Sequence, residues 1–168
     1  MTTTSQRTAP RWTNWGRCAS AEPADVVRPR STAEVAELVR SAAARGQRVK
    51  AVGAGHSFTS IAATDGVMVR MDRIAGIQRV DRETGHVTVG AGMRLRDLNR
   101  ALDQIGLALP NMGDVDPQTV SGATSTGTHG TGARHTGIAG AIVGLEIVTG
   151  DGTVLVVTPD DRELFGAA

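Results

Sequence analysis

The chain has 168 residues, with 18 basic and 17 acidic side chains and a formal net charge of +1 at pH 7. Because the charges balance and no basic run is interleaved with aromatic residues, the sequence argues against a nucleic-acid partner. Hydrophobic residues make up 40% of the chain and aromatic residues 2%, which indicates a globular protein with an aliphatic core, in one domain or two small subdomains.

Cysteine content and hydropathy bear on the compartment. The single cysteine, Cys18, cannot form an intramolecular disulfide, which fits a reducing environment. No apolar run approaches the ~20 residues needed to cross a bilayer. We therefore expect no transmembrane segment and a cytoplasmic location, with peripheral membrane association left open.

The first 24 residues predict no regular element. Residues 1–10 are rich in Thr and Ser and lack the apolar core of a signal peptide, so we interpret them as a tail. Residues 11–24 contain Trp12 and Trp15 close to Asn14 and predict an irregular segment pinned by its tryptophans.

The next stretch predicts a small βαβ-β unit. Residues 24–28 suit a strand, and Ser31 and Glu34 form a capping box at the start of a helix with apolar residues at i, i+3, i+4, i+7 and i+8. Residues 48–52 and 67–71 read as two further strands. Because a helical crossover separates them from the first strand, we expect the strands to be parallel.

The remainder predicts two hairpins, a helix and a long irregular segment. Residues 77–90 read as a hairpin, and residues 95–105 carry Leu and Ile at helical spacing. Residues 107–140 are rich in Gly, Ser and Thr with little periodicity, so we expect a loop there. Residues 141–158 read as a second hairpin, and residues 159–164 as the start of a helix.

Two glycine-rich stretches carry the candidate chemistry. The first, residues 52–58, follows a predicted strand and contains Gly53 and Gly55, whose backbone freedom allows N–H groups to converge on a phosphate. A plain tight turn is the alternative, and the Rossmann fingerprint is excluded because Phe58 stands where a glycine is required. The second, residues 119–132, has four glycines and seven hydroxyl residues, which suits a pyrophosphate or a long surface loop.

Neither stretch predicts a metal site. His56 follows the first pair of glycines, and His129 and His135 lie six residues apart in the region of the second stretch. No further His or Cys stands at a metal-ligand spacing from them. We therefore expect the histidines to serve other roles, such as a hydrogen bond that steadies the turn at His56.

The motifs Gly53-Ala54-Gly55-His56-Ser57-Phe58, Asp65-Gly66, Gly106-Leu107-Ala108-Leu109-Pro110-Asn111 and Ser125-Thr126-Gly127-Thr128-His129-Gly130-Thr131-Gly132 occur in this order. This pattern resembles the PCMH-type FAD-binding domain of the vanillyl-alcohol-oxidase-type flavoproteins. Within them it is most similar to gulonolactone and arabinonolactone oxidases or dehydrogenases and to alditol oxidases. The resemblance implies an α+β fold of two α/β subdomains, a small parallel βαβ-β unit and a mixed sheet with helices, with FAD between them.

The resemblance also implies a domain organisation. We expect a tail and irregular segment over residues 1–20, a first FAD-binding subdomain over 21–72, and a second over 73–168. Because the last predicted helix is cut in its first turns, the second subdomain is expected to be truncated and the substrate domain, or cap domain, to be absent. The family draws its substrate-binding residues from that later part.

The resemblance implies the following contacts with FAD. The loop after the second strand holds the pyrophosphate through backbone amides, and His56 matches the histidine that bonds covalently to the flavin 8α carbon. Gly113 and Asp114 match residues beside the isoalloxazine, which makes Asp114 the one catalytic candidate. Alditol oxidases carry a small hydroxyl residue there, so Asp114 argues against an alditol substrate. The expected cofactor-binding residues are Val52, Gly53, Ala54, Gly55, His56, Ser57, Gly113, Asp114, Thr119, Gly122, Ser125, Thr126, Gly127, Thr128 and His129.

The reaction implied is hydride transfer from the CH–OH group of a sugar-1,4-lactone to flavin N5, with dioxygen or another acceptor reoxidising the flavin. Three alternatives stay open: the FAD domain of an alditol oxidase, a flavin-binding fragment without activity of its own, and a structural or interaction domain with no ligand. A flavin spectrum distinguishes the last from the others.

Overall fold

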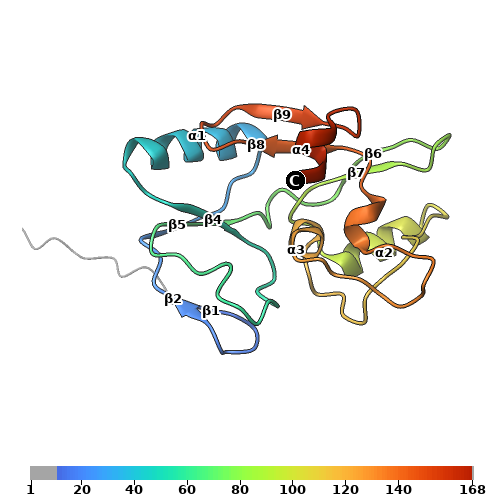
Figure 1. Ribbon diagram of the computed structural model, residues 1–168, viewed down its shortest axis with the longest axis horizontal. Helices are drawn as coiled ribbons and strands as arrows, with labels where there is room; N and C mark the ends of the chain where they lie inside the picture. Colours follow the sequence, from blue (N-terminus) through green and yellow to red (C-terminus); the bar gives the residue numbers. More distant parts are fainter. Residues whose placement is uncertain (1–10, 168) are drawn as a thin grey trace, which may run out of the picture.

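The computed structural model describes residues 11–167, so the predicted tail of residues 1–10 lies outside the described part (Figure 1). The described residues fold into short helices and four separate small sheets, which confirms the predicted α+β class. In order, the elements are β1 (Trp12–Thr13), β2 (Ser20–Ala21), β3 (Asp25–Val27), α1 (Thr32–Ala44), β4 (Val49–Val52), β5 (Val67–Arg70), β6 (Ile77–Val80), β7 (Val87–Val89), α2 (Leu95–Asp103), α3 (Val120–Ser125), the 3-10 helix η1 (Ile138–Ala141), β8 (Leu145–Val148), β9 (Val154–Val157) and α4 (Arg162–Ala167).

The predicted βαβ-β unit is confirmed. Its three strands form a parallel sheet in the order β3-β5-β4, with β5 in the centre. Val67 and Val69 of β5 are buried and pack against Ala42 of α1. A central strand covered in this way needs an almost continuous apolar run, which the sequence of β5 supplies. The Ser31 side chain caps α1 by accepting a hydrogen bond from Glu34 N at 3.2 Å.

A second core lies around α2. Leu98 and Leu102 are buried there with Met93, and the hairpin β6–β7 packs Ile77, Val87 and Val89 against them. These leucines fall on one face of α2 because they are four residues apart. The helix predicted over residues 95–105 is therefore present, and its regular part ends at Asp103.

The last hairpin, β8–β9, packs beside α1 of the βαβ-β unit. β8 and β9 pair antiparallel, and β8 runs beside α1 (Figure 1). Arg40 Nη1 of α1 donates to Gly152 O at 2.9 Å, and the Thr32 hydroxyl of α1 donates to the Glu146 carboxylate of β8. The hairpin thus joins the segments predicted as separate subdomains, residues 21–72 and 73–168, whose boundary stays a prediction.

Three segments differ from the sequence prediction. Residues 11–24, expected to be irregular, contain the two-residue strands β1 and β2, which pair antiparallel. Residues 107–140 contain the helix α3, where an irregular loop was expected. The second hairpin, predicted from residue 141, begins at Leu145, since Ala141 ends the 3-10 helix η1 and residues 142–144 form no strand. α3 has six residues, too few for a helical period to show in the sequence. It is stabilised instead by tertiary packing, since Ala123 is fully buried against Leu95 and Ile138.

Candidate functional site

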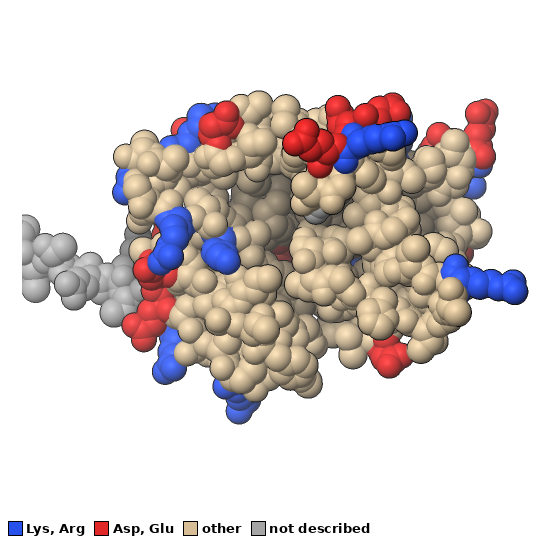
Figure 2. Space-filling model, in the orientation of Figure 1, with Lys and Arg blue, Asp and Glu red and all other residues tan. Residues whose placement is uncertain are grey.

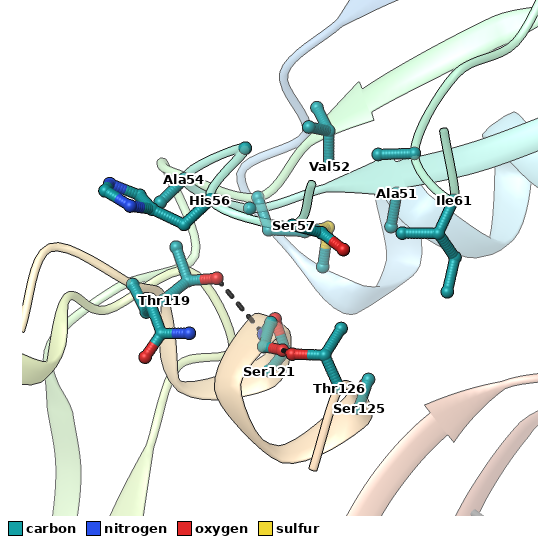
Figure 3. A pocket seen from close by; sticks show the side chains of 16 residues that line it. Ala51, Val52, Ala54, His56, Ser57, Ile61, Thr119, Ser121, Ser125 and Thr126 are labelled. Atoms are coloured by element: carbon teal, nitrogen blue, oxygen red, sulfur yellow. Dashed lines mark hydrogen bonds between the residues drawn. The ribbon is translucent and has the colours of Figure 1, made fainter. Parts of the chain in front are cut away.

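A cavity of about 210 Å³ lies between the loop that follows β4 and the helix α3 (Figure 3). On the face shown in Figure 2, charged side chains gather toward the margins, whereas the hollowed centre is formed by other residues. The lining residues of the cavity are Ala51, Val52, Gly53, Ala54, Gly55, His56, Ser57, Ile61, Ala62, Met71, Gln118, Thr119, Ser121, Gly122, Ser125 and Thr126. Apart from His56, this set contains no titratable side chain, so a ligand would meet a neutral, small-residue surface.

The cavity has two sides, called the loop wall (residues 53–57) and the helix wall (residues 119–126). They meet where Gly53 and Gly122 both face Thr119 Oγ1. A Cβ atom on Gly53 would overlap this oxygen outright, and one on Gly122 would lie 2.8 Å from it. Because no side chain fits at either position, the walls expose backbone to the cavity, which is the surface that a phosphate group binds.

The helix wall is fixed by hydrogen bonds within residues 119–126 and by one bond to the segment that precedes α2. The Thr119 side chain accepts from Gly122 N at 3.2 Å and caps α3. The Ser121 hydroxyl donates to Ala91 O at 2.9 Å, and the Thr126 hydroxyl donates to Gly122 O at 2.8 Å. Since these hydroxyl protons are engaged with carbonyl groups, the oxygens of Ser121 and Thr126 are left as acceptors toward a ligand.

Gln118 is a cavity residue that the sequence analysis did not single out. Its Nε2 donates to Thr128 Oγ1 at 2.9 Å, and its buried Oε1 has no hydrogen-bond partner within residues 11–167. A buried carbonyl oxygen without a partner costs about 1–3 kcal/mol, so this atom suits a hydroxyl or N–H donor on a ligand. Only its position directly before the Thr119 cap could have indicated its role.

His56 stands at the margin of the loop wall, and its ring lies apart from Ser121 and Ser125 (Figure 3). The imidazole stacks on Trp15, with ring centroids 5.1 Å apart and planes inclined by 18°. The loop turns at Gly55, whose φ of +72° belongs to the left-handed region that favours glycine. The fold therefore places an imidazole on the cavity rim with an aromatic ring against it.

The structure brings together most of the predicted site residues. Ten of the fifteen line the cavity: Val52, Gly53, Ala54, Gly55, His56, Ser57, Thr119, Gly122, Ser125 and Thr126. The other five lie outside its lining: Gly113, Asp114, Gly127, Thr128 and His129. Of these, Gly113 lies against the 128–129 backbone, with a Cβ position 3.1 Å from His129 O, while Asp114 and His129 are exposed.

The carboxyl groups with lowered pKa values all lie away from the cavity. The Arg48 side chain hydrogen bonds to Asp65 and lowers its pKa, and hydrogen bonds from Thr84 and Glu83 lower the pKa of Asp81. In the β8–β9 turn, the Thr149 hydroxyl and Thr153 N lower the pKa of Asp151 to about 2.

Within residues 11–167 no three His, Cys, Asp or Glu side chains are grouped so that they could hold a metal ion.

Comparison with known proteins identifies the family. The family described as "FAD binding domain" matches residues 23–158, which span both walls of the cavity. The chain belongs to this FAD-binding family. Its residues fit the cofactor, because the glycine contact between the walls leaves room for phosphate beside backbone, and Gln118 Oε1 is free to accept from a hydroxyl. At about 210 Å³ the cavity is below the ~300–1,000 Å³ of common ligand sites, so it suits one part of a dinucleotide.

Three relatives of this FAD-binding chain carry names that describe lactone chemistry. It is 49% identical, over 93% of its length, to the L-gulono-1,4-lactone dehydrogenase of Mycobacterium tuberculosis (strain ATCC 25618 / H37Rv). It is 41% identical over 92% of its length to the L-gulonolactone oxidase of Mus musculus, and 38% identical over 92% to the D-arabinono-1,4-lactone oxidase of Saccharomyces cerevisiae. The matches cover 36%, 36% and 30% of those relatives, so the chain spans about a third of their length.

Across residues 11–167 we find no helix with the length and apolar character to cross a membrane.

Proposed function

We propose that this chain is the FAD-binding part of an oxidoreductase that acts on the CH–OH group of a sugar-1,4-lactone of the gulono-, galactono- or arabinono- type. The observation that carries the proposal is the neutral cavity whose two glycine walls meet at Thr119, within the region matched by the FAD-binding family. The relatives named for gulonolactone and arabinonolactone support the substrate class.

In this proposal the loop wall and the helix wall hold the cofactor between them. Backbone N–H groups of residues 53–57 face the pyrophosphate, with Thr119 and Gly122 opposite. Gln118 Oε1 accepts from a hydroxyl of the cofactor, which satisfies the buried oxygen. When bound, FAD supplies the two-electron acceptor for the hydride of the substrate, and dioxygen or another acceptor reoxidises it. The residues Gly113, Asp114, Gly127, Thr128 and His129 are assigned to the edge of the flavin ring.

We also propose that His56 is bonded covalently to the flavin. The new bond joins an imidazole nitrogen of His56 to the 8α methyl carbon. One N–H and one C–H bond break, and the two electrons and two protons released reduce the flavin, which dioxygen or another two-electron acceptor then reoxidises. The support is the place of His56 on the cavity rim, directly after the loop that turns at Gly55.

The chain spans about a third of its relatives' length. In this proposal the residues that hold the lactone lie in the remaining part. Asp114 is the one carboxylate of this chain assigned near the ring. There are two alternatives to a lactone oxidoreductase: the chain is the FAD domain of an alditol oxidase, or it is a flavin-binding domain that is inactive by itself. The free, exposed Cys18 fits a cytoplasmic location.

The reaction is tested by following the absorbance of bound flavin in anaerobic protein mixed with gulono-, galactono- or arabinono-1,4-lactone, or with xylitol. Bleaching by a lactone and not by xylitol supports the lactone assignment. Bleaching by xylitol alone favours the alditol oxidase. FAD that binds but is bleached by none of them indicates a domain that needs the remaining length of the protein, and protein that binds no FAD contradicts the proposal.

The covalent bond is tested by denaturing FAD-loaded protein and measuring flavin fluorescence in the protein band of a gel. Wild-type protein should retain flavin, and His56→Ala should lose it while still binding FAD before denaturation. The matched control is His86→Ala, because His86 is exposed, lies outside the cavity lining and is not among the residues assigned to the cofactor. Wild-type protein that releases all of its flavin would rule out the bond.

A further inference from the structure

The N-terminal hairpin, residues 12–21, holds the loop wall on both sides of His56. On one side, Trp15 N donates to Gly55 O at 2.8 Å. On the other, Asn14 Nδ2 donates to Ser57 O at 2.9 Å. The backbone of His56 is therefore bracketed by two hydrogen bonds from a segment about forty residues earlier in the chain.

The Asn14 side chain connects the turn of the hairpin to the loop wall. Its side chain is buried, with only 3% of the residue exposed. While Nδ2 reaches the loop wall, Oδ1 accepts hydrogen bonds from Cys18 N and Ala19 N, both at 3.0 Å. One amide group thus closes the turn of the hairpin and ties that turn to the loop wall, so the position of Trp15 is coupled to the position of His56.

Trp15 is an exposed tryptophan with a defined contact. It is 65% exposed, yet its ring lies against the His56 imidazole, with a centroid separation of 5.1 Å. Phe58 is 68% exposed and meets Trp15 edge-on at 6.3 Å. Among residues 11–167, no hydrogen bond engages either ring nitrogen of His56, so the stacking on Trp15 is the contact that restrains the ring.

We propose that Trp15 is a positioning residue that presents the His56 imidazole to the flavin for attachment, an inference that rests on the proposed covalent bond. Stacking limits the imidazole to the orientations parallel to the indole, and Asn14 fixes the indole relative to the loop. A nucleophile held in one orientation reacts faster than one that samples many, because less orientational freedom is lost in reaching the transition state. Trp15 acts through His56 and needs no contact with substrate.

The test measures the rate of covalent attachment after FAD is added to apoprotein, from flavin fluorescence retained by denatured protein at successive times. Trp15→Ala should slow attachment about three- to tenfold, the range expected for losing one aromatic pair. Trp15→Phe should restore most of the rate, because it keeps a flat ring. Phe58→Ala is the matched control, since Phe58 is equally exposed but touches Trp15 only by its edge.

A second measurement reports on the imidazole without FAD. In proton spectra of apoprotein, the Cε1–H signal of His56, assigned by its loss in His56→Ala among four histidines, should lie upfield because of the indole ring current. In Trp15→Ala it should move to the position typical of a free imidazole, while dispersed amide signals show that the fold persists. Non-covalent FAD content should be equal in all variants.

The outcomes separate the two proposals. Wild-type protein that attaches no flavin contradicts the covalent bond and this inference together. Wild-type protein that attaches flavin, with Trp15→Ala attaching it at the same rate, overturns the positioning role alone. An unshifted His56 signal in wild-type apoprotein overturns the stacking on which that role depends, and failure of Trp15→Phe to restore the rate counts against a ring-orientation mechanism.

Discussion

The two walls of the cavity have similar compositions but are held in place differently. The loop wall is fastened from outside, by the bond between Asn14 and Ser57, which are 43 residues apart. The helix wall has an internal support, the bond between Thr119 and Gly122, which are three residues apart, and is also held by the burial of Ala123 and by the bond from Ser121 to Ala91 O, 30 residues earlier. Glycine-rich segments have few side chains of their own to pack, so each wall depends on a support that its composition does not reveal.

The same contrast separates the two histidines that follow glycine-rich motifs. His56 lines the cavity and is stacked on Trp15. His129 is exposed, and its Nδ1 lies 2.9 Å from Gly130 O of the adjacent residue. Similar local sequences thus produce one ring restrained at a cavity and one ring on the surface, because within residues 11–167 His56 has an aromatic partner from a distant segment and His129 has none.

Removing the outer support should have the largest effect. Asn14→Ala deletes the donor to Ser57 O and the acceptor for Cys18 N and Ala19 N. At about 1 kcal/mol for each hydrogen bond lost, we expect the free energy of unfolding to fall by roughly 2–4 kcal/mol in urea titrations. Asn14→Asp, which replaces the Nδ2 donor with a carboxylate oxygen facing Ser57 O in a buried position, should destabilise the protein at least as much as alanine. Equal stability of all three proteins would mean that the hairpin does not support the loop wall.

Separating the walls should come next. Gly53→Val places a side chain where Thr119 Oγ1 lies, so the loop wall must move away from α3. Overpacking of this kind costs about 1–3 kcal/mol, and we also expect FAD content in the purified protein to fall to near zero. Gly150→Val is the matched control, because nothing lies within 4 Å of the added Cβ and the cavity is elsewhere. Full FAD content in Gly53→Val would place the cofactor away from this contact.

Weakening the inner support should have a smaller effect. Thr119→Val removes the oxygen that caps α3 while keeping the shape of the side chain, at a cost of about 1 kcal/mol in the free energy of unfolding. The His56 proton signal should not change, because the loop wall keeps its own support. The control is Thr124→Val. The Thr124 hydroxyl donates to Val120 O and Ser121 O and does not contribute to the cap, so its loss should lower the free energy of unfolding by less. A Thr119→Val protein with a shifted His56 signal would show that the walls are coupled more tightly than the bonds indicate.

The smallest effect concerns a group outside both walls. Hydrogen bonds from Thr149 and Thr153 lower the pKa of Asp151 from 3.8 to about 2. A lowered pKa means that the native state favours the carboxylate, so this stabilisation is present above pH 3.8 and is lost as the pH falls toward 2. Asp151→Asn should therefore flatten the pH dependence of unfolding between these two values. Because neither wall contains a carboxylate, Asn14→Ala and Thr119→Val should keep the wild-type slope there.

Local sequence patterns predicted much of the fold. The βαβ-β unit followed from one helical face and an apolar central strand, and α2 followed from its spaced leucines, because long periodic segments reflect which face is buried. The helix α3 was missed, since six residues cannot show a period and its stability comes from Thr119 and the core around Ala123. Ten of the predicted cofactor residues reached the cavity, while Gln118 entered it without any preceding signal.

The sequence by itself determined which segments expose backbone, because Gly53, Gly55 and Gly122 allow conformations and close approaches that no other residue permits. Only the tertiary structure decided that Gly53 and Gly122 face the same threonine, and that Trp15 lies against His56. These contacts join residues 69 and 41 positions apart in the sequence, and no local pattern encodes a distance across the fold. They arise when the buried faces of the sheet, α2 and α3 pack into their cores and carry the glycine-rich segments and the N-terminal hairpin into contact.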